Sequence, residues 1–229
     1  MNDARDLNGR DHLIGAALCI GYLLLLTATA SDLAMSRDES FYVHAAKNAA
    51  NWMSQVSSGP SSVFEREGID RAWRYNWEHP AWMKLSFAWS WLAHEHLGLF
   101  PSESLAFRFP GMLTAGLLLW LIYAWGASVM RREGALFAAL AFAAMPRVFY
   151  HSHLACFDIP IAFFVTLTAY AYWRSLADRR WVPWLGLIFG LALATKHNSW
   201  ILPGIFLIHF LWIRRDQARS GRSERASIA

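Results

Sequence analysis

The chain has 229 residues, of which 55% are hydrophobic and 17% are charged, and its formal net charge is +4. The apolar residues are gathered into long runs, which excludes a soluble globule and indicates a polytopic membrane protein. Most basic residues lie in short segments between these runs, so the charge indicates membrane topology and not nucleic-acid binding. Both cysteines lie within apolar runs, a placement that does not support a disulfide framework.

Six apolar runs predict an all-α fold with about six transmembrane helices. In chain order they cover residues 13–30, 105–129, 135–150, 154–172, 181–195 and 200–213. The first run has a rival interpretation as a signal peptide, because Arg5 and Arg10 precede it and Ala28-Thr29-Ala30 resembles a cleavage site. Its length and the runs that follow favour a membrane span.

Residues 35–106 form a long polar loop after the first run, and a loop of this length should carry helices of its own. Ser36 and Glu39 fit a capping box at the start of a helix. Apolar positions from Phe41 to Trp52 then continue as an amphipathic helix lying at the membrane interface. Residues 82–99 are apolar but interrupted by charged residues, which predicts an interfacial or partly embedded helix.

The arginines that flank the six runs fall on one side of the membrane if every run spans it. They are Arg5, Arg10, Arg131, Arg132, Arg174, Arg179, Arg180, Arg214 and Arg215. This side is then the cytoplasm, where residues 1–12 and the basic tail 214–229 lie. The tail is polar enough to be expected to be disordered. Residues 13–213 form the membrane module, with loop 35–106 outside.

Four charged residues depart from this pattern, because they lie near the outer ends of the apolar runs: Arg108, Arg147, Asp158 and Lys196. A charge at membrane depth is costly unless it has a partner or faces a water-filled cavity. One interpretation is internal salt bridging of Asp158 with Arg147 or Lys196. The other is a polar pocket in which the cations hold an anionic head group. The two interpretations are compatible.

The order of these landmarks resembles that of GT-C fold glycosyltransferases, which use polyprenyl-phosphate sugars. Protein O-mannosyltransferases and lipid A aminoarabinose transferases are the best-known members. The matching segments are Asp38-Glu39, Trp77-Glu78-His79-Pro80, Arg108-Phe109-Pro110-Gly111, Phe157-Asp158-Ile159-Pro160 and Ala194-Thr195-Lys196-His197. Each match alone is weak, but the five occur in the family's order over about residues 13–213. Ala81 departs from the pattern, since a second proline is common there.

The resemblance implies an integral-membrane enzyme that moves a sugar from a polyprenyl-phosphate donor to an acceptor, with inversion, on the external or periplasmic face. Such a transfer needs a base for the acceptor hydroxyl and positive charge for the departing phosphate. Asp38 matches the first carboxylate of the family's acidic pair and is the candidate base. Glu39 is the second catalytic candidate, although the capping box also explains it. Asp38 has its own alternative, as an acid at a helix N-terminus.

The same resemblance suggests substrate contacts for six residues: Glu78, His79, Arg108, Arg147, Asp158 and Lys196. The basic ones are candidates for the lipid phosphate, to which an arginine fork is well suited. Glu78 matches a residue that binds a divalent metal in some members, and His151 and His153 are further candidate metal ligands. On an extended segment, however, alternating side chains point to opposite faces, so joint chelation needs a turn. Glu78 and His79 can equally form an interfacial polar pair.

The expected partners are membrane lipids and the lipid-linked sugar, with the acceptor left open between protein, lipid and glycan. The expected location is a bacterial inner membrane, with both termini cytoplasmic. Family members usually continue through more spans than these six, so the chain is expected to be a fragment or a truncated member. A non-catalytic protein that binds or transports a lipid phosphate is the competing hypothesis. An inverted-repeat transporter is disfavoured, because the two halves show no symmetry.

Overall fold

The computed structural model describes residues 5–59 and 61–227, with side chains described as far as residue 216. This part of the chain is all-helical and contains no strand. The longer helices are α1 (Gly9–Thr29), α2 (Arg37–Ser58), α3 (Arg66–Trp73), α4 (Ala81–Leu97), α5 (Glu103–Val129), α6 (Arg132–Ala144), α7 (Pro146–Ser152), α8 (Asp158–Ser175), α9 (Val182–Thr195) and α10 (Leu202–Ser227). Short 3₁₀ turns are η1 (Ala30–Asp32), η2 (Ser61–Phe64), η3 (Arg179–Trp181) and η4 (His197–Ile201).

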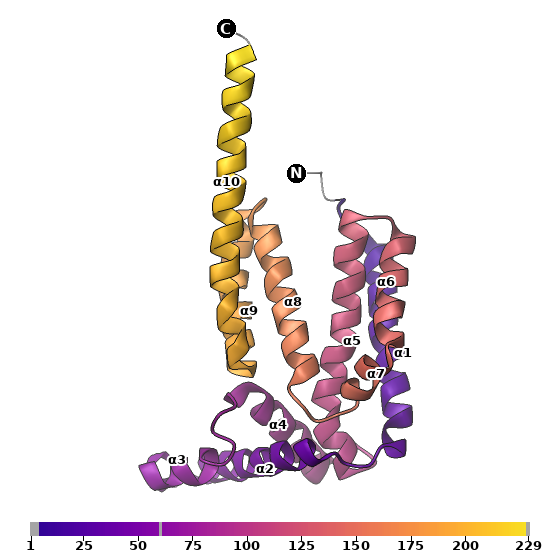
Figure 1. Cartoon of the computed structure of the whole chain (residues 1–229). Helices are drawn as coiled ribbons and strands as arrows, with labels where there is room; N and C mark the ends of the chain where they lie inside the picture. Colours follow the sequence, from indigo (N-terminus) through magenta and orange to yellow (C-terminus); the bar gives the residue numbers. More distant parts are fainter. Residues whose placement is uncertain (1–4, 60, 228–229) are drawn as a thin grey trace.

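The helices form two groups whose axes are roughly parallel (Figure 1). A third set of helices forms a layer across one end of both groups. Helices α1, α5 and α6 make one group, and α8, α9 and α10 make the other. Helices α2, α3 and α4 lie across the lower end, while both chain ends lie toward the opposite end. Loops that are distant in sequence therefore meet beside the crossing layer, where we find the candidate site.

Helices α1 and α5 pack closely because small residues lie at their contact. A Cβ atom at Gly116 would lie 2.8 Å from the Cys19 carbonyl oxygen, and one at Gly15 would collide with the Trp120 ring. Small residues let helix backbones approach in this way in membrane proteins. Leu26 and other apolar side chains fill the core between α1, α5 and α6. The packing holds the C-terminal end of α1, and hence the start of α2, against α5.

A buried carboxylate ties the other end of these three helices together. Asp11 on α1 is bound by Arg5 at 2.8 Å and by Arg132 of α6 at 2.7 Å, and the Tyr123 hydroxyl of α5 donates to it at 3.4 Å. A buried charge is tolerated when it is paired and hydrogen-bonded in this way. Arg5 and Arg132, which the positive-inside rule assigns to the cytoplasmic side, therefore also hold the bundle together.

Each of the six predicted runs contains helical structure. Of the described helices, however, only two are long and apolar enough to cross a membrane, namely α1 with η1 and α5. A third span is possible if α6 and α7, which meet at a 70° bend, count as one. Helix α9 has 14 residues and α8 has 18 with a charge near each end. The expectation of about six spans is thus supported for two or three of them.

The structure agrees with the prediction for loop 35–106 and disagrees with the prediction for the C-terminal tail. The helix expected after Ser36 is confirmed as α2, and residues 82–99 form most of α4, so segment 35–106 carries helices of its own. The expectation of a disordered tail is wrong as far as residue 227, because α10 continues through the polar segment to Ser227.

Candidate functional site

The site begins at the N-terminus of α2, where Asp38 and Glu39 lie. The Ser36 hydroxyl accepts a hydrogen bond from the Glu39 backbone N–H, and the Glu39 carboxylate accepts one from the Ser36 N–H at 2.8 Å. This reciprocal capping box is the one expected from the sequence. It starts the helix at Arg37 and turns the Glu39 side chain back toward the bundle.

Glu39 is fully buried and bound by groups from two other elements. Its Oε1 accepts from Arg108 Nε at 2.8 Å and from the Ala155 N–H at 2.9 Å, and its Oε2 accepts from Arg108 Nη2 at 3.0 Å. Burial acts to raise the pKa of Glu39, but Arg108 and the two backbone N–H groups outweigh it and leave the pKa lowered. The carboxylate is therefore ionised and joins α2, α5 and the α7–α8 turn.

Arg108 is also buried, with 1% of its surface exposed, and its hydrogen-bond donors are bound within the protein. Besides Glu39, its guanidinium donates to three backbone carbonyls at the end of α1, those of Ala30, Leu33 and Ala34, at 2.9 to 3.1 Å. Five donors, the number a guanidinium carries, are thus used inside the protein.

Two candidates from the sequence consequently change role. Arg108 has no N–H left for a lipid phosphate, and Glu39 has no accessible oxygen for an acceptor hydroxyl. We assign both to a structural link, the Glu39–Arg108 clamp, which joins the end of α1 to α2 and α5. The alternative explanation of Glu39 as a capping residue is the one that the geometry favours.

Asp38 contrasts with its neighbour. Its side chain is exposed and makes no hydrogen bond or ion pair with any described residue. It lies in the first turn of α2, at the positive end of the helix dipole. Because residues four apart share a helix face, Asp38 lies beside Tyr42.

Tyr42 belongs to an aromatic triad with His79 and Phe157 that joins three segments. The ring centroids are 4.6 Å apart for Tyr42 and Phe157, 5.0 Å for His79 and Phe157, and 5.4 Å for Tyr42 and His79. Tyr42 comes from α2, His79 from the turn before α4, and Phe157 from the turn before α8. The triad therefore places the neighbours of these residues, Glu78 and Asp158, next to the N-terminus of α2.

Three carboxylates surround the triad: Asp38, Glu78 and Asp158. Burial first, and then the negative charges of Asp38, Asp158 and Glu78 among others, raises the pKa of Tyr42 to about 12. Burial also raises the pKa of Cys156 to about 12, with Glu39, Asp158 and Asp38 adding to the effect. The phenol and the thiol are thus neutral at pH 7. Asp38 and Asp158 both raise the pKa of Tyr42 and of Cys156, so the two carboxylates lie near the same groups.

Lys196 supplies positive charge to this region. Its Nζ lies 2.9 Å from Asp158 Oδ1, and the two side chains are 33% and 54% exposed. His151 Nδ1 lies 3.6 Å from the other oxygen of Asp158, and no hydrogen bond satisfies this nitrogen. Of the two partners that the sequence left open for Asp158, Arg147 and Lys196, the structure pairs it with Lys196. Its exposure leaves further Lys196 donors available to a ligand.

The turn before α4 positions Glu78 and His79. Asn76 has a left-handed backbone with φ of 56°, a conformation that asparagine tolerates, and its side-chain amide donates to Glu78 at 3.0 Å. The buried Lys84 donates to the Asn76 carbonyl. Burial lowers the pKa of His79, so that its ring is neutral at pH 7. Asn76, Glu78 and His79 line a pocket of about 380 Å³ together with Phe41, Tyr42 and Tyr75.

Arg147 is exposed at the start of α7 and has no partner among the described side chains. The three predicted cations thus differ in their partners. All donors of Arg108 are bound within the protein, and Lys196 is paired with Asp158. Arg147 has no partner among the described residues. A free guanidinium on the outer surface of the bundle remains a candidate for an anionic lipid head group.

The residues suggested as metal ligands do not fit a metal site here. Among the side chains that the structure describes, no three of the His, Cys, Asp and Glu type gather closely enough to hold an ion. His153 is fully buried, and its ring nitrogens lie 2.8 Å from the Phe149 carbonyl oxygen and 2.8 Å from Thr29 Oγ1. It therefore has no nitrogen free for a metal. We derive no step through a metal ion.

Some residues of the site were not foreseen, chiefly Tyr42, Phe157 and Lys84. Two of them had a signal in the sequence. Tyr42 lies four residues after Asp38 in a helix that was predicted, and Phe157 directly precedes Asp158. No signal in the sequence indicated that Lys84 is buried beneath the turn, because only the tertiary structure places its amine under Asn76.

The geometry can now be compared with known proteins. The model of the dolichyl-phosphate-mannose-protein mannosyltransferase family matches residues 79–226, which is more than half of the chain. The chain belongs to this family. It is thus a membrane glycosyltransferase of the GT-C type. Searches of the curated proteins and of the solved structures give no match to the chain. The family match begins at His79, so Asp38 and Glu39 lie outside it.

Proposed function

We propose that this glycosyltransferase moves a sugar from a polyprenyl-phosphate donor to an acceptor hydroxyl on the external face of the membrane. The observation that carries the proposal is the convergence of Asp38, Glu78, His79, Asp158 and Lys196 around the aromatic triad at one end of the bundle. The name of the family contains a lipid-phosphate sugar, dolichyl-phosphate-mannose, and a donor of this kind agrees with a cation at this end.

In the proposed reaction, Asp38 takes the proton of the acceptor hydroxyl. The acceptor oxygen then bonds to the anomeric carbon of the donor while the bond from that carbon to the phosphate oxygen breaks. The lipid phosphate leaves with the electron pair. A single displacement of this kind inverts the configuration at the anomeric carbon. Asp38 suits the role of base because, of the three carboxylates around the triad, it is the one that makes no hydrogen bond or ion pair with a described residue.

Positive charge near the departing phosphate would come from Lys196 and Arg147. Asp158 orients the Lys196 amine and leaves its other N–H groups for phosphate oxygens. The neutral His79 ring lines the pocket together with Glu78. Electrostatic groups that are already in place contribute strongly to such transfers, because they cost little reorganisation during the reaction.

The polar layer of α2, α3 and α4 would lie at the external surface, with both chain ends in the cytoplasm of a bacterial inner-membrane protein. The flanking arginines support this orientation through the positive-inside rule. The arrangement of the helices agrees with it, since α1 begins and α10 ends on the side away from the layer (Figure 1).

The test is transfer from a panel of radiolabelled polyprenyl-phosphate sugars by the purified chain. Asp38→Asn should lower transfer by about 10²- to 10⁴-fold, the usual contribution of a general base. Asp6→Asn is the matched control, because Asp6 is an exposed carboxylate in the N-terminal segment before α1. Wild-type turnover by Asp38→Asn would refute the base assignment. Donor binding without transfer by the wild-type chain would favour the non-catalytic lipid-phosphate protein instead.

A further inference from the structure

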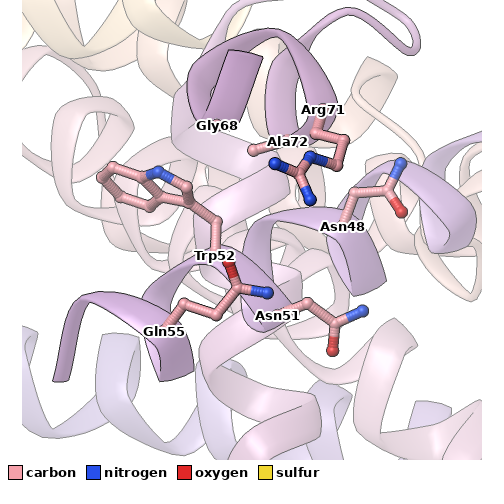
Figure 2. A pocket seen from close by; sticks show the side chains of 7 residues that line it. All are labelled: Asn48, Asn51, Trp52, Gln55, Gly68, Arg71 and Ala72. Atoms are coloured by element: carbon pink, nitrogen blue, oxygen red, sulfur yellow. The ribbon is translucent and has the colours of Figure 1, made fainter. Parts of the chain in front are cut away.

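A second hollow lies between α2 and α3, away from the carboxylates (Figure 2). It measures about 170 Å³, and Asn48, Asn51 and Gln55 of α2 line one wall. These residues share a helix face because they are three and four positions apart. Arg71 of α3 extends toward them from the other wall, and Trp52 lies beside it (Figure 2). We call this hollow the amide pocket.

The polar groups of the amide pocket are free. None of the three side-chain amides and no N–H of Arg71 makes a hydrogen bond or ion pair with another described residue. The Trp52 indole, by contrast, is fixed by its hydrogen bond to the Val63 carbonyl at 3.1 Å. The pocket thus offers a rigid wall, one guanidinium and several amide donors and acceptors. No carboxylate lines it.

Between the amide pocket and the candidate active site lies a further hollow that shares lining residues with both. Arg71 also lines a neighbouring hollow of about 640 Å³, which includes Arg74 and Tyr75. Tyr75 in turn lines the pocket of Glu78 and His79. Each hollow thus shares one lining residue with the next, and we call the series of three hollows the groove. The middle hollow also holds Glu67 and Asp70, of which Asp70 lies 3.9 Å from Arg66.

The length of this groove limits what can occupy it. Asn51 follows Asp38 by 13 positions on the same helix, which corresponds to about 20 Å along its axis at helical rise. A single sugar residue cannot bridge that distance, whereas an extended chain can. A ligand that reaches both ends therefore has several units.

We propose that the groove holds the acceptor as an extended glycan, and that the amide pocket binds one of its anionic sugar units. Arg71 would receive the carboxylate or phosphate of that unit, since the guanidinium fork matches such groups. The three amides would pair with its hydroxyls, because an amide both donates and accepts hydrogen bonds. This inference rests on the proposed transferase function and specifies the acceptor class for the same site.

A saccharide fits this groove better than a peptide does. Peptides in extended form are often bound by adding a strand to a sheet edge, which the helical walls of this groove do not offer. Specific peptide binding also uses apolar anchors in pockets. The amide pocket has instead three free amides and one free cation.

The groove can be tested by saturation-transfer NMR on the purified full chain in detergent micelles. The probes are glucuronate, galacturonate, glucose 1-phosphate, glucose, glycerol 1-phosphate and a serine-rich peptide, each added separately. We expect signals from the anionic sugars and a weaker signal from glucose. Arg71→Gln should weaken binding of the anionic sugars about ten- to hundredfold, as expected for loss of a charge-assisted hydrogen bond. Arg66→Gln, an exposed arginine of the same helix outside the amide pocket, should leave it unchanged.

Three results would overturn the proposal: no signal from any sugar, Arg71-dependent signals from glycerol 1-phosphate alone, or Arg71-dependent signals from the peptide alone. The second would point to a lipid head group and the third to a protein acceptor. Binding to Asp38→Asn separates this proposal from the transferase proposal. Sugar binding that survives in that variant, with or without transfer in the wild type, supports the groove independently of the base. Sugar binding that is lost in Asp38→Asn but kept in Arg71→Gln would place the sugar at the carboxylates and refute the amide pocket.

Discussion

Two pairs of opposite charge lie near the crossing layer, and they differ in what surrounds them. In the Glu39–Arg108 clamp both side chains are buried, and every guanidinium donor ends on a carboxylate or a backbone carbonyl of the protein. In the Asp158–Lys196 pair both side chains are partly exposed, and the lysine amine has further N–H donors that this pair does not use. The same ion-pair chemistry therefore holds the helices together in one place and leaves charge available to a substrate in the other.

Substitutions at the clamp give the most direct test of this difference between a buried and an exposed pair. Glu39→Gln should lower the free energy of unfolding by about 3–5 kcal/mol, because it leaves the Arg108 charge buried without a counter-charge. Thermal unfolding in detergent micelles measures this. The neighbouring Asp38→Asn should cost less than about 1 kcal/mol, the contribution of an exposed acid at a helix N-terminus. Equal costs for the two variants would contradict the division into a buried clamp and an exposed site.

Lys196→Gln tests the other half of the comparison. It should reduce glycosyl transfer by about 10²- to 10³-fold, as expected for a group that stabilises a developing charge, while an exposed pair changes stability by less than about 1 kcal/mol. Initial rates with a radiolabelled polyprenyl-phosphate sugar provide the measurement. Lys47→Gln is the control, because Lys47 forms a similarly exposed pair with Glu103 on another face of the layer. If both variants lost transfer equally, the role of Lys196 would be structural.

Acid should weaken the clamp in a defined direction. The pKa of Glu39 is lower in the folded chain than its ordinary value of 4.5, so its contribution to stability is complete above that value. The contribution is lost as pH falls through the lowered pKa, at about 1.4 kcal/mol per pH unit. The difference in unfolding free energy between the wild type and Glu39→Gln should therefore stay constant from pH 7 to about 4.5 and narrow as pH falls further toward 3. A difference that stays constant over the whole range would argue against an ionised Glu39.

The smallest expected effect concerns Arg147, the free cation at the start of α7. Arg147→Gln should lower transfer about tenfold if its guanidinium contacts the lipid phosphate, and should leave thermal unfolding unchanged because the side chain has no partner to lose. Arg147→Lys should restore part of the rate by restoring the charge. Unaltered transfer in Arg147→Gln would leave Lys196 as the cation of the site.

Much of the local structure followed from the sequence. The capping box of Ser36 and Glu39, the amphipathic helix after it and the pairing of Asp158 with Lys196 were all predicted and are present. Each depends on signals within a few residues or on a charge too costly to leave unpaired. The family motifs also indicated the glycosyltransferase class, which the family match confirms.

The role of Arg108 is where prediction from the sequence failed. A charge in an apolar run needs a partner, but the sequence does not say whether the partner is a substrate or the protein itself. Three carbonyls at the end of α1 and the carboxylate of Glu39 became its partners only because α1, α2 and α5 meet there. Burial thus assigned one predicted site residue to structure and left its neighbour Asp38 exposed.

The sequence alone determined that this protein is helical, apolar and equipped with charges near the ends of its apolar runs, because periodicity and hydrophobicity are local properties. Only the tertiary structure decided which of those charges remain available. Hydrogen-bond donors are limited in number, and the packing of distant helices determines which acceptors use them. The same packing brought α3 against α2 and produced the groove that leads to the carboxylates, which no local pattern indicated.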